Sequence, residues 1–250
     1  MAEVTSDVIE RIWQALSRWA VPVMMALAYA FLAATSETDT AGKAWMAVGL
    51  MLVLVVWFVF RALTETAALA RALRIGDTTR LFALAARHLP RARRPADRAR
   101  FLVAQAFGHA LRGEPAEALG VIGEARPDAE LQPLASVVTI GALVELGRAA
   151  EARALVVTAP RAPALAWLAE GQIAWGDGAL DAAAPLLARV IDDVRAGSAT
   201  RAIAHVYAAR VADAQGDAPS AARHRAAAAN LATPDATWLR GQGATPTVAP

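Results

Sequence analysis

Two apolar runs lie near the start of the chain, and helical periodicity of polar and apolar positions prevails after them. The runs cover residues 19–34 and 44–60. The second has seventeen residues with no charge and no proline, which make about 25 Å of helix, close to the ~30 Å hydrocarbon core of a bilayer. This pattern predicts a transmembrane hairpin over residues 19–62, with helices at about residues 19–36 and 44–62.

Amphipathic side chains flank both runs, as they do at membrane interfaces, where tryptophan rings settle and arginine extends its charged head. The predicted interface residues are Trp13, Trp19, Trp45, Trp57 and Arg61. Residues 1–18 place apolar side chains on one helical face and charged ones on the other. They fit either an amphipathic helix on the membrane surface or a plain extension of the first membrane helix.

The distribution of charge predicts the orientation of this hairpin. Residues 35–43 carry two acids and one lysine, whereas the segment after Phe60 is rich in arginine. Because basic residues stay on the cytoplasmic side, we expect both termini in the cytoplasm and the protein in a bacterial inner membrane. A cleaved signal peptide is the alternative, since residues 28–30 match a cleavage site, but the long acidic N-terminal segment disfavours it.

A repeat of about 34 residues is visible in the rest of the chain. Glycines separated by 37, 34, 31 and 38 residues each stand between two helical stretches: Gly76, Gly113, Gly147, Gly178 and Gly216. The second stretch of each pair ends near a helix breaker: Pro90, Pro127, Pro160, Gly197 and Pro234. Glycine suits the left-handed turn that ends a helix, so we expect helix–turn–helix units repeated about five times.

Short segments around these glycines resemble one another. They are GEPAEAL at 113–119, GRAAEAR at 147–153 and GDAPSAA at 216–222. An alanine stands five residues after four of the glycines: Ala118, Ala152, Ala183 and Ala221. In these features residues 64–234 resemble the tetratricopeptide repeat family, although Leu81 replaces the expected alanine in the first unit. The resemblance implies an α-solenoid with a concave surface for partners; a non-repetitive helical bundle is the alternative.

Together these patterns predict an all-α protein: a two-helix transmembrane hairpin followed by a tetratricopeptide-like α-solenoid. The expected parts are an amphipathic segment (1–18), the hairpin (19–62), a cytoplasmic helical-repeat domain (63–234) and a tail (235–250) in which Trp238 and Leu239 are a docking point. No glycine or proline lies between Phe60 and Arg74, so the second membrane helix is expected to continue as the first helix of the repeats.

One dense cluster of charge stands out, although the formal net charge is only +2. It is the segment RARRPADRAR, whose arginines are Arg91, Arg93, Arg94, Arg98 and Arg100. Beside a membrane anchor, such a cluster indicates contact with anionic lipid or an acidic partner. A solvated loop between repeats is the alternative. Nucleic acid is not indicated, because the cluster lacks interleaved aromatic residues.

Signs of catalysis are lacking. The chain has no cysteine and four dispersed histidines, which give no metal-ligand spacing, and it has none of the common catalytic motifs. We therefore expect neither an enzyme nor a cofactor. The predicted function is a membrane-anchored scaffold or assembly factor that contacts lipid and other proteins at the cytoplasmic face of the inner membrane. The alternative is a permanent accessory subunit of a photosynthetic or respiratory complex.

Overall fold

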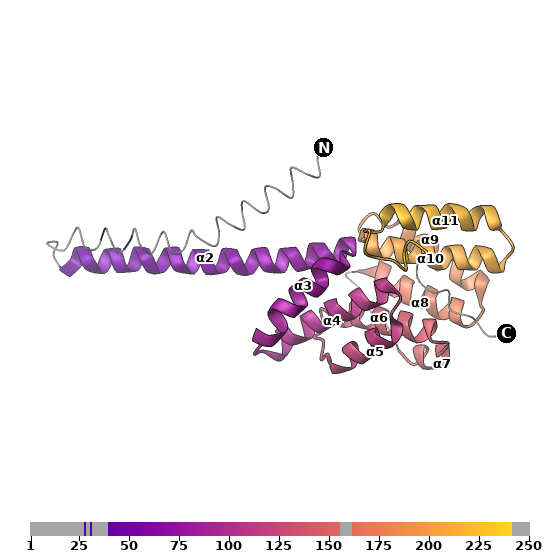
Figure 1. Cartoon of the computed structure of the whole chain (residues 1–250), viewed down its shortest axis with the longest axis horizontal. Helices are drawn as coiled ribbons and strands as arrows, with labels where there is room; N and C mark the ends of the chain where they lie inside the picture. Colours follow the sequence, from indigo (N-terminus) through magenta and orange to yellow (C-terminus); the bar gives the residue numbers. More distant parts are fainter. Residues whose placement is uncertain (1–27, 29–30, 32–39, 156–161, 242–250) are drawn as a thin grey trace. The chain divides into compact units, whose positions relative to one another are not determined.

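The computed structural model describes residues 28, 31, 40–155 and 162–241. The chain forms two compact units, residues 1–65 and 66–250. Every regular element in the described part is a helix, which confirms the all-α prediction (Figure 1).

Unit 1 contains most of the helix α2, Thr40–Ile75, which continues without a break as its lack of glycine and proline after Phe60 predicts. Several large apolar side chains of α2 are exposed: Val48, Met51, Leu52, Val53, Val55 and Val56. Trp57 is partly buried, and the side chains of Trp45 and Arg61 lie outside the described ones.

The transmembrane hairpin is a wrong prediction. Among the described residues, no helix combines the length and the apolar character needed to cross a bilayer. In α2 the uninterrupted apolar run is held to seventeen residues by Lys43 and Arg61, which is short of the ~20 that a spanning helix needs. The other predicted spanning helix (19–36), the segment 1–18, Trp13 and Trp19 lie outside the described residues.

Unit 2 begins with the last turns of α2 and continues through shorter helices. They are α3 (Thr78–His88), η1 (Leu89–Arg91), α4 (Pro95–Arg112), α5 (Pro115–Glu124), α6 (Gln132–Glu145), α7 (Ala149–Ala152), α8 (Pro163–Gly176), α9 (Leu180–Asp192), α10 (Ser198–Ala214) and α11 (Ala218–Leu231). Proline stands in the first turn of α4, α5, α6, α8 and α11, where its missing N–H costs nothing.

The turn glycines behave as the sequence predicts. Each adopts a φ between 72° and 78°, and no other residue type in the described part has a positive φ. Gly113, for example, ends α4 in the left-handed conformation, and its N–H bonds back to the last carbonyls of that helix. The alanines five residues later are fully buried: Ala118, Ala152, Ala183 and Ala221. Small side chains at these positions allow successive helices to approach closely, as expected.

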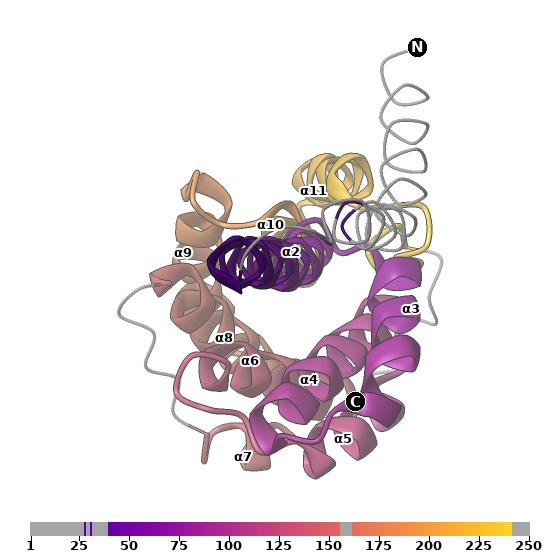
Figure 2. The ribbon, with the colours of Figure 1, turned by 90° about the vertical axis from the view of Figure 1, so that its left-hand side faces the viewer.

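Neighbouring helices pack in sequence: α3 on α4, α4 on α5, α5 on α6, α6 on α8, and then α8 through α11. The end of this array returns to its beginning (Figure 2). Thr233 Oγ1 donates to the carbonyl of Gly76 at 2.8 Å, and the Trp238 N–H donates to the carbonyl of Leu111 at 3.3 Å. Ser198 Oγ, at the start of α10, donates to the carbonyl of Arg74.

These contacts change the picture of an open solenoid. In a solenoid each repeat touches only its neighbours, whereas here the end of α2 bonds to the start of α10, and the segment after α11 bonds to Gly76 and Leu111. In the segment after α11, the expected docking residues Trp238 and Leu239 are buried. The predicted solenoid arrangement is therefore not confirmed for the described residues.

Candidate functional site

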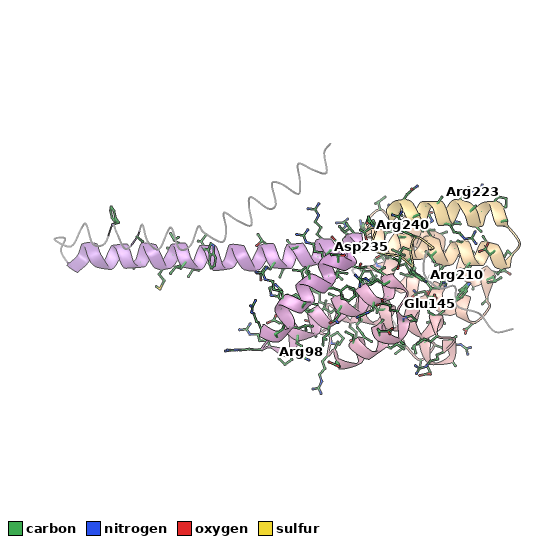
Figure 3. The ribbon with its side chains drawn as sticks, in the orientation of Figure 1. Arg98, Glu145, Arg210, Arg223, Asp235 and Arg240 are labelled. Carbon is green, nitrogen blue, oxygen red and sulfur yellow. The ribbon has the colours of Figure 1, made fainter. Side chains whose placement is uncertain are left out.

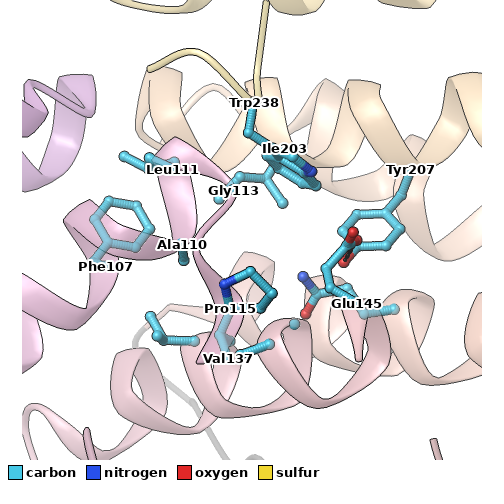
Figure 4. A pocket seen from close by; sticks show the side chains of 14 residues that line it. Phe107, Ala110, Leu111, Gly113, Pro115, Val137, Glu145, Ile203, Tyr207 and Trp238 are labelled. Atoms are coloured by element: carbon cyan, nitrogen blue, oxygen red, sulfur yellow. Dashed lines mark hydrogen bonds between the residues drawn. The ribbon is translucent and has the colours of Figure 1, made fainter. Parts of the chain in front are cut away.

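A cavity of about 260 Å³ lies inside unit 2. Its apolar wall comes from α4, α6, α10 and the C-terminal segment, through Phe107, Leu111, Val137, Val138, Ile203 and Trp238. Figure 4 shows Phe107 at one end of the cavity and the polar groups of Tyr207 and Glu145 at the other. The cavity is thus mostly apolar, with its polar groups gathered at one end, as is typical of ligand pockets.

The polar end is built around Glu145, the last residue of α6. Tyr207 donates its hydroxyl proton to Glu145 Oε1 at 2.8 Å. Arg210, one turn further along α10, donates to both carboxylate oxygens, to Oε2 at 3.1 Å. The side chains of Arg210 and Glu145 are only 19% and 12% exposed, so the pair is largely removed from water (Figure 3). The bidentate hydrogen bonding between Arg210 and Glu145 offsets part of the desolvation cost of burying both charges.

Aromatic rings surround the guanidinium of Arg210. Its central carbon lies 5.1 Å from the ring centre of Trp175, 5.3 Å from that of Tyr207 and 5.4 Å from that of Trp238. Tyr207 also meets both tryptophan rings edge-on, at 5.6 Å and 5.9 Å between centres. Such contacts favour the cation and hold the rings in fixed orientations. The cluster therefore ties α6, α8, α10 and the C-terminal segment together.

Neither of the two proton-bearing groups is suited to exchange its proton near neutral pH. Burial raises the pKa of Tyr207 well above its usual value of 10, and the charge of Glu145 raises it further. Burial is the largest single influence on Arg210 and lowers its pKa, but the hydrogen bonds to Glu145 and the charge interactions with Tyr207 and Glu145 together leave the pKa raised. A general acid or base needs a pKa near the working pH. Tyr207 and Arg210 therefore stay protonated near neutral pH.

Gln172 of α8 is one of the residues that line the cavity. Its side chain is only 3% exposed, and its Oε1 is a fully buried acceptor with no hydrogen-bond partner among the described residues. Gly141 makes room for this amide: a Cβ at position 141 would lie 2.9 Å from Gln172 Nε2. An unpaired buried acceptor carries a free-energy cost that the rest of the fold has to offset.

The arginine cluster lies elsewhere. Its members run from the end of η1 into the first turns of α4, where Figure 3 labels Arg98. None of them lines the cavity. Four are exposed and Arg100 is partly buried. Arg98 approaches Glu124 at 3.7 Å, an exposed pair of small energetic weight. Among the described residues, no carboxylate forms an ion pair with Arg91, Arg93 or Arg94.

A histidine pair joins α10 to α11. The Nδ1 atoms of His205 and His224 lie 3.0 Å apart, so one ring donates and the other accepts. Burial, then the neighbouring charges of His224 and Arg201, lower the pKa of His205 to about 4. Two imidazoles alone make an incomplete metal site, and the described residues contain no group of three or more potential metal ligands.

No pattern in the sequence predicted the cavity. Glu145 and Arg210 are 65 positions apart, and neither belongs to a recognisable motif. The available signal was weak: Trp175 and Trp238 are large aromatic residues far from the apolar runs, and each needs a buried partner surface.

No protein-family model matches the chain. No curated protein and no solved structure matches it either.

The resemblance to the tetratricopeptide repeat family is accordingly wrong. Its strongest features were the turn glycines and the alanines that follow them. A left-handed glycine and a small residue at a close helix contact are required by any tight pair of helices. These positions therefore report local turn geometry, and they do not discriminate one helical family from another.

Proposed function

We propose that the helical array of unit 2 is a protein-interaction scaffold or assembly factor. The observation that carries the proposal is the exposed arginine cluster at the start of α4, in which Arg91, Arg93 and Arg94 have no ion-pair partner among the described residues. Arginine binds carboxylates through two parallel hydrogen bonds, so the surface suits an acidic segment of another protein. Tyr207 and Arg210 in the cavity wall and beside it both have raised pKa values and stay protonated near neutral pH, which favours binding over catalysis.

Two further predictions accompany this proposal. Anionic lipid headgroups offer arginine the same chemistry as carboxylates, so lipid is the other proposed partner of the cluster. The cytoplasmic face of a bacterial inner membrane stays the predicted location, with both termini in the cytoplasm.

Charge reversal within the cluster tests the proposal. The double variant R93E/R94E is compared with R189E/R195E, which changes the net charge equally at two exposed positions on and after α9. In affinity purification of the full chain, we expect R93E/R94E to lose its partner proteins and R189E/R195E to keep them. Sedimentation with anionic vesicles separates the lipid contribution. Equal recovery of partners by both variants would contradict the proposal.

A permanent accessory subunit is the second candidate, and a separate observation favours it. Val48, Met51, Leu52, Val53, Val55 and Val56 expose a band of large apolar side chains on α2. Exposed apolar surface of this kind is typical of obligate interfaces. A subunit of a photosynthetic or respiratory complex should elute with its partners at a fixed ratio in size exclusion, whereas a transient scaffold should elute alone.

A further inference from the structure

We propose that unit 2 contains a docking groove for a segment of another protein, and that residues 233–241 of the chain itself occupy this groove as an intramolecular competitor. These residues, called the strap from here on, follow α11. The inference goes beyond the scaffold function and uses no residue of the arginine cluster. Three observations carry it: the bonds that hold the strap, the side chains that it buries and the cavity beside its tryptophan.

Few backbone hydrogen bonds hold the strap. In the described part of the chain, one backbone–backbone bond joins it to the helices, from the Trp238 N–H to the Leu111 carbonyl at 3.3 Å. The other hydrogen bonds come from threonine hydroxyls, among them Thr79 Oγ1, which donates to the carboxylate of Asp235 at 2.6 Å. A segment held in this way can leave while the helices keep their own backbone bonds.

The side chains of the strap divide into an exposed set and a buried set. Exposed are Pro234, Asp235 and Arg240. Buried are Ala236, Trp238 and Leu239. A few buried anchors next to exposed positions are typical of a peptide segment docked on a protein surface. The strap thus shows what the groove accepts: an acidic residue, a small residue after it, and then a tryptophan–leucine pair.

Trp238 is the main anchor of the strap. Its ring centre lies 5.9 Å from that of Tyr207 and 5.4 Å from the guanidinium carbon of Arg210. The indole also lines the cavity of about 260 Å³, so part of its surface has no packing partner (Figure 4). A competing segment that places more side-chain atoms in this space gains contacts that the strap does not make.

The covalent connection to α11 decides which occupant can compete. A segment tethered this closely has an effective concentration on the order of millimolar at its own groove. The identical segment of a second copy offers the same contacts without the tether, so it binds less well. The occupant that can displace the strap is therefore a segment of another protein that carries an acidic residue and a tryptophan–leucine pair and makes further contacts in the cavity.

A synthetic peptide of residues 233–240 is the probe, in fluorescence anisotropy with the full chain. W238A removes the anchor of the strap, so it should bind the peptide at least about tenfold more tightly than the wild type. A peptide with alanine in place of the tryptophan should bind W238A at least about tenfold more weakly. The control W175A removes the other tryptophan that contacts Tyr207 and Arg210, and it should bind the peptide as the wild type does.

D235A is a second variant, which loosens the strap and keeps its buried side chains. It removes the carboxylate that Thr79 contacts, so it should bind the peptide about threefold more tightly than the wild type. The control D193A removes a carboxylate bonded to an N–H in the turn before α10 and should have no such effect. Circular dichroism establishes that each variant is folded; if W238A does not fold, D235A decides the question.

Hydrogen exchange of the wild-type chain tests whether the strap opens by itself. The amide of Trp238 should exchange at least about tenfold faster than those in the middle of α10, and D235A should accelerate the first and not the second. Three results would overturn the proposal. They are no gain in peptide binding by the folded variants, exchange of the Trp238 amide only at the rate of α10, and a dimer of the wild type that W238A abolishes, which would assign the groove to a second copy.

Discussion

Tyr207 of α10 donates its hydroxyl proton to Glu145, the last residue of α6, across 62 positions of the chain and a distance of 2.8 Å. This hydrogen bond is at the polar end of the cavity, where Glu145 also accepts hydrogen bonds from the guanidinium of Arg210. It links two helices that are not neighbours in the sequence, and it holds the Tyr207 ring beside those of Trp175 and Trp238.

Removing this hydroxyl should lower stability without emptying the core. In Y207F the ring remains, while Glu145 loses one hydrogen-bond donor. We expect the free energy of unfolding to fall by about 1–2 kcal/mol, the usual cost of a buried hydrogen bond. Urea denaturation followed by circular dichroism measures this change. Unaltered stability in Y207F would show that the bond has no energetic role.

Breaking the ion pair should cost more than losing the hydroxyl. E145A leaves the guanidinium of Arg210 buried without its partner carboxylate, which destabilises proteins by about 3–5 kcal/mol. R210M leaves the carboxylate unpaired, with a similar cost. The double variant E145L/R210M removes both charges and should be more stable than either single variant, because no unpaired charge remains. Additive losses in denaturation experiments would contradict a direct coupling between the two residues.

The turns between the helices could be predicted from the sequence, whereas the contacts that join the end of the helical array to its beginning could not. Gly76 and Gly113 could be placed at helix ends because a left-handed residue is a local requirement that glycine meets best. The buried alanines five residues later follow from the same local geometry. The contact between Thr233 and Gly76, in contrast, depends on the summed angles of every helix between them, and no local pattern encodes that sum.

Local sequence patterns also explain why the buried ion pair of the site was missed and why a membrane-spanning helix was wrongly predicted. Glu145 and Arg210 are ordinary charged residues on two helices, and only the three-dimensional array makes them a buried pair. Residues 44–60 have the composition of a spanning helix but end at seventeen residues, so a small difference in length separates a membrane helix from an apolar α-helix.

The histidine pair should make stability depend on pH. The pKa of His205 is about 4 in the folded protein and about 6.5 when the chain is unfolded, so protonation favours unfolding. The part of the free energy of unfolding that depends on a neutral His205 is therefore fully present above pH 6.5 and is lost as the pH falls towards 4. Burial and Arg223 also lower the pKa of His224, whereas Asp217 raises it. Arg201 faces the pair from α10 and opposes a positive charge there.

Between pH 7.5 and pH 5, we expect a loss of about 1–2 kcal/mol that depends on His205, less than the full shift implies because His224 stays partly open to water. H205F removes the titrating group and keeps a ring of similar size, so its stability should change less over this range. Denaturation at the two pH values measures the difference. A pH dependence of H205F equal to that of the wild type would assign the effect to other groups.

Two glycine substitutions should have opposite effects. Gly197, before α10, lies against the end of α2, and a Cβ there would approach the carbonyl oxygen of Arg74 to 2.7 Å. Backbone atoms cannot move aside easily, so G197A should destabilise the protein by about 1–3 kcal/mol and weaken the closure of the array. Gly120 is inside α5, and a Cβ added there would meet nothing within 4 Å, so G120A should stabilise by about 0.5–1 kcal/mol through helix propensity.

The two variants carry the same chemical change, which makes each the control of the other in thermal denaturation. Hydrogen exchange then locates the effect of G197A: amides at the start of α10 and in the segment that bonds to Gly76 should exchange faster, while those of α5 should not. The close approach of Gly197 to Arg74 is what excludes a side chain at this position. If G197A were as stable as G120A, the end of α2 and the start of α10 would not be held together by this contact.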